Sequence, residues 1–354
     1  MPRLRLRYLA ASALILLLVP AIAACGTSSA GGTGSTSTST SANHSNIKIG
    51  LVTDIGGLND RGFNHLAYVG LMQAKKDFGV TVSVKESKSG DDYVPNLTAY
   101  ATQGYNLVIA VGFLMQQAVG TVSGQFPNVH FAIIDGAGTD ANGNDLHHAN
   151  VESLVFREQE AGALVGVIAG MMEKDNLTKT HNNVLSAVGG VSIPPVNHYI
   201  AGYKWGAEQV DPSVKVLVGY SNDFSDPSKC LGVANGQIAQ GADIVFQVAG
   251  GCGLGALQAA GQKGVYSIGV DTDQKTADSS VVASAVKRVD VATYDAIKAV
   301  VNGKFQGGAD TFTLKNNGVG YAPGNIQLPP DIVNQVKAIE QKIINGSVTV
   351  PDSL

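Results

Sequence analysis

The chain contains few cysteines and few charged residues, and it lacks the short motifs of common enzymes. Its 354 residues include three cysteines and a charged fraction of 15%. No G-x-S-x-G nucleophile elbow, P-loop or H-E-x-x-H zinc motif is present. Neither Cys230 nor Cys252 has a histidine or a further cysteine at metal-ligand spacing. The sequence therefore gives no sign of catalysis, and we expect neither a metal nor a cofactor.

The chain also lacks a basic run that could bind nucleic acid. Its formal net charge is −4, and removal of residues 1–24, which contain three arginines, lowers it to −7. Because the phosphate backbone repels an acidic protein without a basic patch, a nucleic-acid partner is not expected. After its first residues, the chain has no apolar run that is long and uninterrupted enough to span a bilayer.

The first residues are typical of an export signal. A basic start with three arginines precedes the apolar run Tyr8–Ala24, which ends in small residues directly before Cys25. This pattern predicts a lipoprotein signal peptide over residues 1–24 and a lipid on Cys25. The alternative is an ordinary signal peptide that happens to contain a cysteine.

A tract of low complexity follows the cysteine. Thr27–Asn46 consists almost entirely of Ser, Thr, Gly, Ala and Asn, a composition that cannot bury a core. We therefore expect residues 25–46 to form a tether between a lipid anchor and a globular body. Such an arrangement predicts an exported protein held at the extracytoplasmic face of the cell membrane.

The two remaining cysteines fall in consecutive strand–helix units. Cys230 and Cys252 each follow the end of an expected strand, so their loops should be neighbours. An exported chain allows such cysteines to pair, and we expect a disulfide between them. Two buried free thiols are the alternative.

From residue 47 onward, apolar runs of strand length alternate with segments of helical periodicity. The expected strands are Ile47–Val52, Val80–Glu86, Leu107–Val111, His130–Ile134, Asn150–Val155, Asn183–Val188, Lys215–Tyr220, Ile244–Val248, Tyr266–Val270, Val281–Ala285 and Thr311–Lys315. The expected helices are Phe63–Phe78, Tyr93–Gln103, Met115–Phe126, Glu158–Met172, Ile193–Val210, Pro227–Gln240, Gly253–Gly264, Val291–Asn302 and Pro330–Gly346. This alternation predicts an α/β protein with doubly wound parallel sheets.

About 300 residues exceed the usual size of one such sheet, so we expect two. One half starts at Ile47 and the other near Asn183, and each has about four strand–helix units. Two similar lobes that face each other form a cleft, which is a preferred place for a ligand.

The turn between the first strand and the first helix carries polar and aromatic side chains. Asp54 ends the strand, a diglycine follows at Gly56 and Gly57, and Phe63 and Asn64 open the helix. Because ligands bind at the carboxyl ends of parallel strands, these groups could bind and stack on a polar ring. A turn that uses these residues only for capping and backbone freedom is equally compatible with the spacing.

Later turns offer similar groups. Asp271 and Lys287 end neighbouring strands and could hold vicinal hydroxyls, although a surface ion pair is the plainer interpretation. Phe63 and Phe224 come from opposite halves and could sandwich a planar base, or they could be ordinary core residues.

Two further patterns have competing interpretations. The run 250–255 reads G-G-x-G-x-G, and we expect Gly251 and Gly253 to let backbone N–H groups approach a ligand. A dinucleotide site and tight packing without a ligand are the alternatives. His147 and His148 lie in a polar loop that is better explained as solvated than as a metal site.

Taken together, these motifs resemble the basic membrane protein family of lipoproteins, which are receptors of the purine nucleoside type. The resemblance covers residues 47–325. Its motifs are Val52-Thr53-Asp54-Ile55-Gly56-Gly57 with Asp60 and Phe63-Asn64, Ala249-Gly250-Gly251, Gly253-Leu254-Gly255, Gly269-Val270-Asp271-Thr272-Asp273-Gln274 and Ser284-Ala285-Val286-Lys287-Arg288-Val289-Asp290. The segment 59–62 differs from the family's commoner version, and Cys252 stands where the family usually has threonine.

The resemblance implies a two-lobed type I periplasmic-binding-protein-like fold, in which each lobe is a doubly wound parallel sheet and three crossovers join the lobes. We expect the N-terminal lobe to comprise 47–156 and 288–322, and the C-terminal lobe 157–287 and 323–354. The family's nucleoside contacts, carried over, fall on Asp54, Phe63, Asn64, Asp135, Phe224, Asp271 and Lys287. The two phenylalanines would stack on the base, and Asp271 and Lys287 would hold ribose hydroxyls.

The resemblance thus predicts a monomeric, lipid-anchored solute-binding protein that delivers a nucleoside to the permease and ATPase of an ABC importer. One alternative is a binding protein for another small polar solute, such as a sugar or a signal molecule. A surface sensor and, less readily, a nucleoside-processing enzyme are the others.

Overall fold

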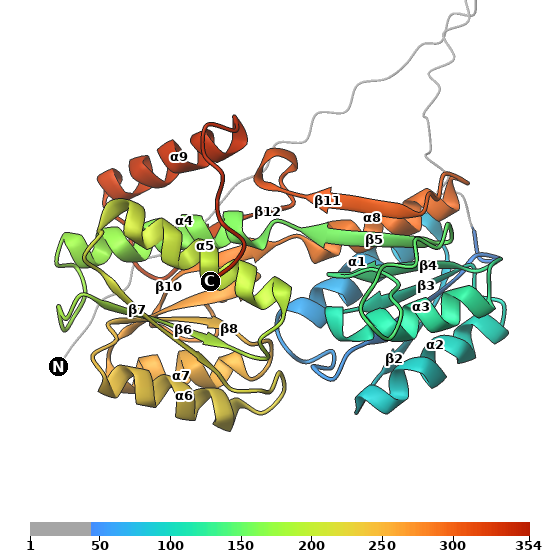
Figure 1. Ribbon diagram of the computed structural model, residues 1–354, viewed down its shortest axis with the longest axis horizontal. Coiled ribbons are helices and arrows are strands. Elements are labelled where there is room, and N and C mark those ends of the chain that lie inside the picture. The colour runs from blue at the N-terminus through green and yellow to red at the C-terminus, as the bar shows by residue number, and fades with distance from the viewer. Residues whose placement is uncertain (1–43) are drawn as a thin grey trace, which may run out of the picture. The chain divides into compact units, whose positions relative to one another are not determined.

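The computed structural model describes residues 44–354, in which the strands form two six-stranded sheets (Figure 1). All neighbouring strands in the first sheet are parallel. In spatial order these strands are β11 (Gly308–Phe312), β5 (Val151–Phe156), β4 (His130–Ile134), β3 (Leu107–Val111), β1 (Lys48–Thr53) and β2 (Thr81–Glu86).

The second sheet repeats this arrangement with one antiparallel edge strand, β12, which pairs with β10. In spatial order its strands are β12 (Val319–Pro323), β10 (Val281–Lys287), β9 (Tyr266–Asp271), β8 (Ile244–Val248), β6 (Val184–Gly189) and β7 (Lys215–Tyr220). We call each sheet, with the helices that cover it, the first or the second lobe.

Helices connect the strands in the expected alternation. They are α1 (Phe63–Phe78), α2 (Tyr93–Thr102), α3 (Gln116–Gln125), α4 (Glu158–Lys174), α5 (Pro194–Val210), α6 (Pro227–Ala239), α7 (Gly253–Lys263), α8 (Val289–Val301) and α9 (Pro330–Ile344). Three short 3-10 turns lie at Gly90–Asp92, Phe113–Met115 and Leu314–Asn316. None of the helices in residues 44–354 is both long and apolar enough to cross a membrane.

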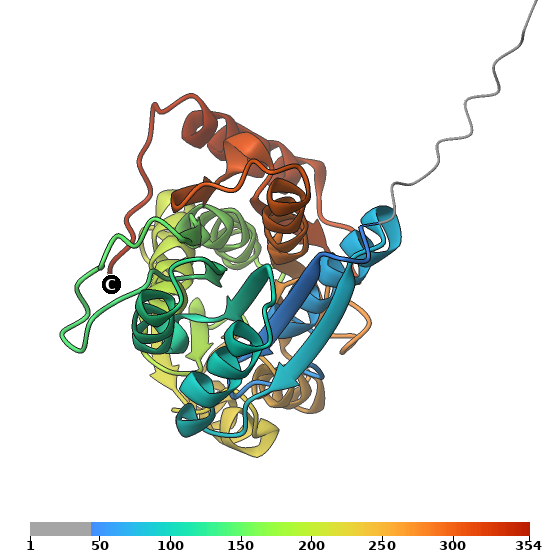
Figure 2. The same ribbon diagram turned by 90° about the vertical axis from the view of Figure 1, so that its right-hand side faces the viewer.

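Both faces of the first sheet are buried. Ile49 and Leu51 of β1 pack in one apolar cluster with Leu71 of α1, on the face that α1 and α8 cover. Val52 points to the opposite face and packs with Leu97 of α2, beside α3. Figure 2 brings this lobe to the front, with β1 in blue beside β2. A strand that is buried on both faces reads as a continuous apolar run, which is why β1 and β3 were recognisable from sequence.

The second sheet is covered in the same way, by α4 and α5 on one face and α6 and α7 on the other. Phe246 of β8 packs with Tyr203 of α5. Val245, its neighbour in β8, lies in the cluster that contains Ala256 of α7. Helices α4 and α5 approach each other so closely that a methyl group on Gly162 or Gly202 would overlap a backbone carbonyl of the other helix.

The chain passes between the two sheets at three places: after β5, after β10 and after β11. This topology confirms the expected two-lobed α/β fold with three crossovers. The crossovers are tied together, since Arg157 N donates to Phe312 O at 2.9 Å and Arg288 N donates to Gly318 O at 2.9 Å. The carboxylate of Glu160 also accepts from Leu314 N at 2.8 Å.

Three details differ from expectation. The expected strand at 311–315 lies earlier, as β11, because residues 314–316 turn into a 3-10 helix. The expected helix at 115–126 begins as a 3-10 turn and becomes α3 at Gln116. Residues 319–322, which we placed in the N-terminal lobe, belong to β12 of the second sheet. That strand contains Gly320 and ends in Pro323, so its sequence suggests a loop, and only pairing at the sheet edge makes it a strand.

Candidate functional site

A narrow cavity of about 70 Å³ lies between the carboxyl ends of the two sheets. Its walls are formed by residues of both lobes, which come from strand ends, from the turns after them and from helices α1 and α5. They are Asp54, Gly56, Asp60, Phe63, Asn64, Gly112, Phe113, Asp135, Ile193, Pro195, Val196, Tyr199, Phe224, Val248, Ala249, Gly250, Val270, Asp271 and Lys287. This set includes seven of the nine residues that the sequence suggested as ligand contacts.

The turn after β1 contains two aspartates, Asp54 and Asp60, which accept hydrogen bonds from different groups. Asp60 caps α1, because its carboxylate accepts from the backbone N–H groups of Gly62, Asn64 and His65 at 2.7–3.1 Å. Asp54 accepts from Asn64 Nδ2 at 2.9 Å and from Gly56 N at 2.9 Å. Burial raises the pKa of Asp54 to about 6. The cap therefore fixes the start of the helix, and the helix aims Asn64 at Asp54.

Asn64 retains an unused acceptor. Its Oδ1 is buried and has no hydrogen-bond partner within the part of the chain that the structure describes. An amide that donates to Asp54 and keeps a free oxygen can still accept a hydrogen bond from a ligand N–H or O–H group. Asp54 and Asn64 thus offer a bound molecule acceptors that are held rigidly.

Four aromatic residues line the cavity, and two of them, Phe63 and Phe224, come from different lobes. Phe63 is the first residue of α1, and Phe224 lies in the loop between β7 and α6. The Phe224 ring packs against Gly190, where a methyl group would overlap its edge. The ring of Phe63 lies 5.0 Å from the ammonium of Lys287. The arrangement offers apolar surface from both lobes to one planar ligand.

Lys287 ends β10 and is almost completely buried, with 1% of the residue exposed. Its Nζ donates to Asp135 Oδ2 at 2.6 Å and to Glu158 Oε1 at 2.9 Å. Burial opposes the charge on Lys287, but the carboxylates of Asp135, Glu158 and Asp271 outweigh it and raise its pKa above the usual value. The ammonium therefore stays protonated and is held within a cluster of acids.

Asp135, which follows β4, and Asp271, which ends β9, share an unusual backbone conformation, with φ of 67° and 63°. Aspartate tolerates this left-handed region better than most residues, and it turns both side chains into the cavity. Asp271 Oδ1 accepts from the hydroxyl of Tyr199 at 3.2 Å, and burial raises the pKa of Asp271 to about 6. Asp135 Oδ1 is buried and has no partner among the described residues.

Gly251 and Gly253 do not contribute to the cavity wall, although their neighbour Gly250 does. Gly253 opens α7, and a methyl group there would overlap the side-chain amide of Gln247. It thus lies in tight contact with the protein itself. A role of these two glycines in ligand binding remains a prediction.

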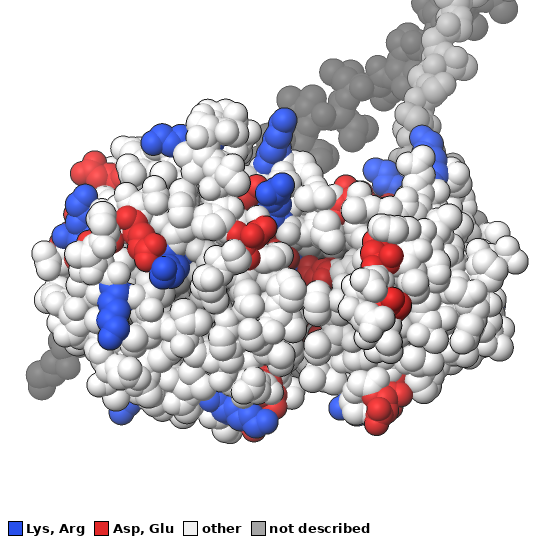
Figure 3. Space-filling view, viewed as in Figure 1, with Lys and Arg blue, Asp and Glu red and all other residues white. Residues whose placement is uncertain are grey.

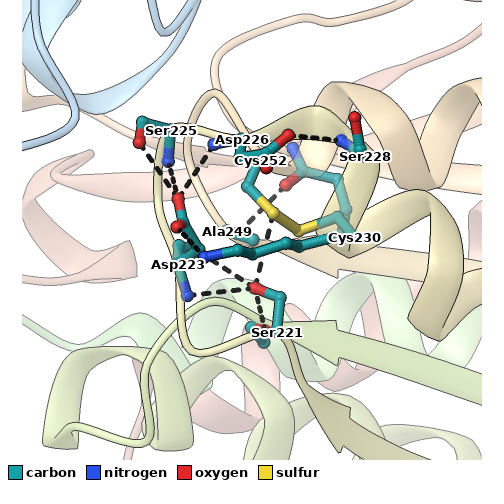
Figure 4. The surroundings of a disulfide bond; sticks show 11 residues. Ser221, Asp223, Ser225, Asp226, Ser228, Cys230, Ala249 and Cys252 are labelled. Atoms are coloured by element: carbon teal, nitrogen blue, oxygen red, sulfur yellow. Dashed lines mark hydrogen bonds and ion pairs between the residues drawn. A yellow bond between two sulfur atoms is a disulfide. The ribbon is translucent and has the colours of Figure 1, made fainter.

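The cysteines of the second lobe form the disulfide that the sequence led us to expect, Cys230–Cys252, with Cα atoms 5.5 Å apart. It joins the start of α6 to the turn before α7, beside the loop that carries Phe224 (Figure 4). Cys252 N donates to Phe224 O at 3.0 Å. Asp223 holds the same loop, since it accepts from the backbone N–H groups of Ser225 and Asp226 at 2.7 and 2.8 Å. The disulfide and Asp223 together fix the backbone on both sides of the aromatic ring.

Sequence reasoning missed Glu158 and Tyr199, which complete the cluster. Glu158 is 2% exposed and opens α4 after β5, at the first crossover. Its sequence signal is weak, because Glu160, Glu173 and Lys174 are charged residues of the same helix. Its second oxygen, Oε2, lies 3.0 Å from His198 Nδ1. Tyr199 gave no signal, because an aromatic residue on the buried face of α5 looks like part of the core.

The histidine pair lies in a second hollow of about 570 Å³, which shares Phe113, Asp135 and Pro195 with the first cavity. His147 is exposed and paired with Asp145, and His148 Nδ1 lies 2.8 Å from Ser123 Oγ. No cluster of three or more His, Cys, Asp or Glu side chains between residues 44 and 354 is arranged to hold a metal.

On the face that Figure 3 shows, the basic side chains of the described residues lie apart and form no continuous patch. Acidic side chains of the described residues are visible between them and within a hollow of that face. This distribution offers no electrostatic path for a nucleic-acid backbone there.

Comparisons with known proteins agree with this geometry. Residues 47–353 match a protein family described as "ABC transporter substrate-binding protein PnrA-like". The chain is 35% identical over 288 residues to an uncharacterized lipoprotein of Pyrococcus horikoshii, a match that covers 78% of this chain and 69% of the relative. It is 32% identical to the "ABC transporter nucleoside-binding protein BmpA" of Lactococcus lactis subsp. cremoris, with 87% and 90% of the two chains covered.

Among solved structures, the chain is similar to an ABC transporter solute-binding protein from Aeropyrum pernix K1. The two share 30% sequence identity and superpose with a TM-score of 0.78, which covers 86% of this chain and 94% of the other.

Proposed function

Since this chain belongs to the family of PnrA-like ABC transporter substrate-binding proteins, we propose that it binds a purine nucleoside in the cavity between its two lobes. Members of this family bind solutes for transport and are not enzymes. One observation carries the proposal: Phe63 and Phe224 line the same cavity as the acids Asp54 and Asp271 and the ammonium of Lys287. A nucleoside is a flat aromatic ring joined to a polyol, and it needs both kinds of surface.

The base would lie between the two phenylalanine rings. Stacking on an aromatic side chain contributes about 1–3 kcal/mol per base. The edge of the base would face the Asp54 carboxylate and the unpartnered Oδ1 of Asn64, which can accept hydrogen bonds from ring or amino N–H groups. The similar protein from Lactococcus lactis, which is named as nucleoside-binding, supports a nucleoside as the kind of ligand.

The ribose would lie at the acidic end of the cavity. Asp271 can accept from vicinal hydroxyls, and Lys287 has a third N–H donor beyond the two that Asp135 and Glu158 use. The four aspartates of the wall outnumber its single lysine, so a phosphate group would meet mostly like charge. The site should therefore prefer nucleosides to nucleotides.

The two lobes would move to admit the ligand. A cavity of about 70 Å³ is smaller than the roughly 300–1,000 Å³ of typical small-molecule sites. Hinge motion at the three crossovers would widen it, with 47–156 and 288–322 moving against 157–287 and 323–354, apart from strand β12.

The protein would act at the outer face of the cell membrane. Several relatives are named lipoproteins, which supports a lipid on Cys25, although that residue lies outside the described part of the chain. In this role the protein is a monomer, tethered through residues 25–46, and it passes its ligand to the permease and ATPase of an importer. Metabolic labelling with a fatty acid should mark the wild-type protein and leave Cys25→Ala unlabelled.

Isothermal titration with inosine, adenosine, guanosine, cytidine and free ribose tests the ligand. We expect the purine nucleosides to bind most tightly, and the absence of any nucleoside binding below about 1 mM would refute the proposal. Tight binding of ribose alone would indicate a sugar-binding protein instead. Mass spectrometry of the recovered nucleoside should show it unchanged.

A further inference from the structure

Lys287 forms ion pairs with two carboxylates, Glu158 and Asp135, which belong to different lobes. We propose that Glu158 is the permanent partner that positions Lys287 within the second lobe, and that Asp135 pairs with Lys287 only when the two lobes meet. Glu158 thus acts as a positioning residue, whereas Asp135 forms an ion pair that joins the two lobes when they are closed. The inference rests on the proposed function only for the claim that Lys287 contacts the nucleoside.

Glu158 and Lys287 both belong to the second lobe. Lys287 ends β10 of the second sheet, and Glu158 opens α4, which packs on β10 and on α5. The fit between α4 and α5 is tight, since a methyl group on Gly162 would overlap Tyr199 O and one on Gly206 would overlap Ala163 O. The 2.9 Å separation of Lys287 Nζ from Glu158 Oε1 is therefore set inside the second lobe.

Asp135 belongs to the first lobe. It follows β4 in the middle of the first sheet, and its Oδ2 lies 2.6 Å from Lys287 Nζ. This ion pair crosses from one lobe to the other, so a hinge motion that separates the lobes lengthens it. The same motion leaves the pair of Glu158 and Lys287 intact.

The ion pair between Glu158 and Lys287 keeps the buried ammonium paired when the lobes separate. A buried ammonium without a partner is strongly destabilising, and the side chain of Lys287 is only 2% exposed. If Asp135 were the only counter-ion, opening the lobes would leave the ammonium unpaired or let it swing toward another acid. Glu158 prevents this, and His198 on α5 holds its other oxygen at 3.0 Å.

Glu158 also leaves the ammonium aimed at the cavity. Two of the three N–H groups of Lys287 point to Glu158 and Asp135, and the remaining donor is available to a ligand. When Asp135 withdraws, Glu158 alone determines where the lysine points. The open protein would then present a lysine that is already oriented toward an incoming ribose hydroxyl.

The test measures how fast Lys287 reacts with a small acylating reagent, by peptide mass spectrometry and without any nucleoside. The proteins are the wild type, Asp135→Asn, Glu158→Gln and the control Glu160→Gln. Glu160 lies in the same helical turn but accepts from Leu314 N and does not contact Lys287. We expect Glu158→Gln to raise the rate about tenfold or more, since a loosened lysine samples exposed positions, and Glu160→Gln to leave it unchanged.

Asp135→Asn gives the decisive comparison, because it should change the Lys287 rate by no more than about twofold. A rise well above twofold in Asp135→Asn would overturn the inference, even if Glu158→Gln proves too unstable to measure. Glu158→Asp, which restores the charge, should recover a slow rate. These measurements need no ligand, so failure of the wild type to bind nucleosides would refute the proposed function and leave this inference standing.

Discussion

The side-chain amide of Asn64 donates a hydrogen bond to Asp54 Oδ1 at 2.9 Å, and both side chains are buried in the wall of one cavity. Ten residues separate them in the sequence, and the cap of α1 by Asp60 brings them together. The amide keeps Asp54 in place and leaves its own oxygen free. This pair is a buried, hydrogen-bonded surface that the first lobe presents to a ligand.

Replacement of Asp54 by alanine should weaken nucleoside binding by about 1–3 kcal/mol, which is the usual cost of an unpaired buried polar group. The substitution removes one acceptor and frees Asn64 to rotate. Isothermal titration with inosine measures the change, and Asp91→Ala, an exposed acid outside the cavity, serves as control. Equal affinities of wild type and Asp54→Ala would show that this turn does not contact the ligand.

Replacement of Asp271 by asparagine should stabilise the protein at neutral pH while it weakens nucleoside binding. Burial raises the pKa of Asp271 from 3.8 to about 6, so the folded state disfavours its charge. A raised carboxyl pKa means that the folded state binds more protons than the unfolded state, and stability falls as the pH rises from about 4 to 6. Asparagine is uncharged, is nearly isosteric and tolerates the φ of 63°.

Urea denaturation at several pH values checks this prediction. We expect Asp271→Asn to gain up to about 2–3 kcal/mol at pH 7.5 and to lose that advantage as the pH falls toward 4, where the wild-type carboxyl group is neutral. A stability difference that does not depend on pH would contradict the assignment of an unfavourable buried charge to Asp271.

Much of the fold was predictable because its signals are local. Strands such as Leu107–Val111 are buried on both faces and read as apolar runs, and helices such as Phe63–Phe78 repeat their apolar residues at helical spacing. Strand β12 could not be predicted, because Val319–Pro323 becomes a strand only through pairing with β10. Gly320 and Pro323 oppose a strand, so the local sequence does not indicate one.

The site was predictable only in part, for a similar reason. Asp54, Asp135 and Asp271 follow strands, and the rule that ligands bind at strand ends selects such positions. Glu158 opens α4 and Tyr199 lies within α5, and their place in the cluster depends on how these helices pack with β10 and with each other. Nothing near them in the sequence indicates that packing, so only the structure could show it.

Removal of the disulfide should lower stability and loosen the loop that carries Phe224. The bond joins cysteines 22 residues apart, and such a link contributes about 2–4 kcal/mol. We expect Cys230→Ala/Cys252→Ala to lose about that much in urea denaturation and to bind nucleosides more weakly than the wild type. A reducing agent should reproduce both effects in the wild type and have none in the double variant. Unchanged affinity after reduction would mean that Asp223 alone holds the loop.

The close contact of α4 with α5 can be tested with two glycines that differ only in their surroundings. A methyl group on Gly202 would overlap the backbone carbonyl of Gln159, whereas one on Gly232, in the exposed part of α6, would meet nothing within 4 Å. Gly202→Ala should therefore destabilise the protein by about 1–3 kcal/mol through overpacking. Gly232→Ala should stabilise it by up to about 1 kcal/mol, because alanine is the better helix former.

Both changes are read from urea denaturation midpoints at constant m-value. Gly202→Ala should also weaken nucleoside binding, because the residue lies on α5 close to His198 and Tyr199, which hold Glu158 and Asp271. The affinity of Gly232→Ala should equal that of the wild type. If Gly202→Ala lowered stability without any loss of affinity, the positions of α4 and α5 would not control the geometry of the acid cluster.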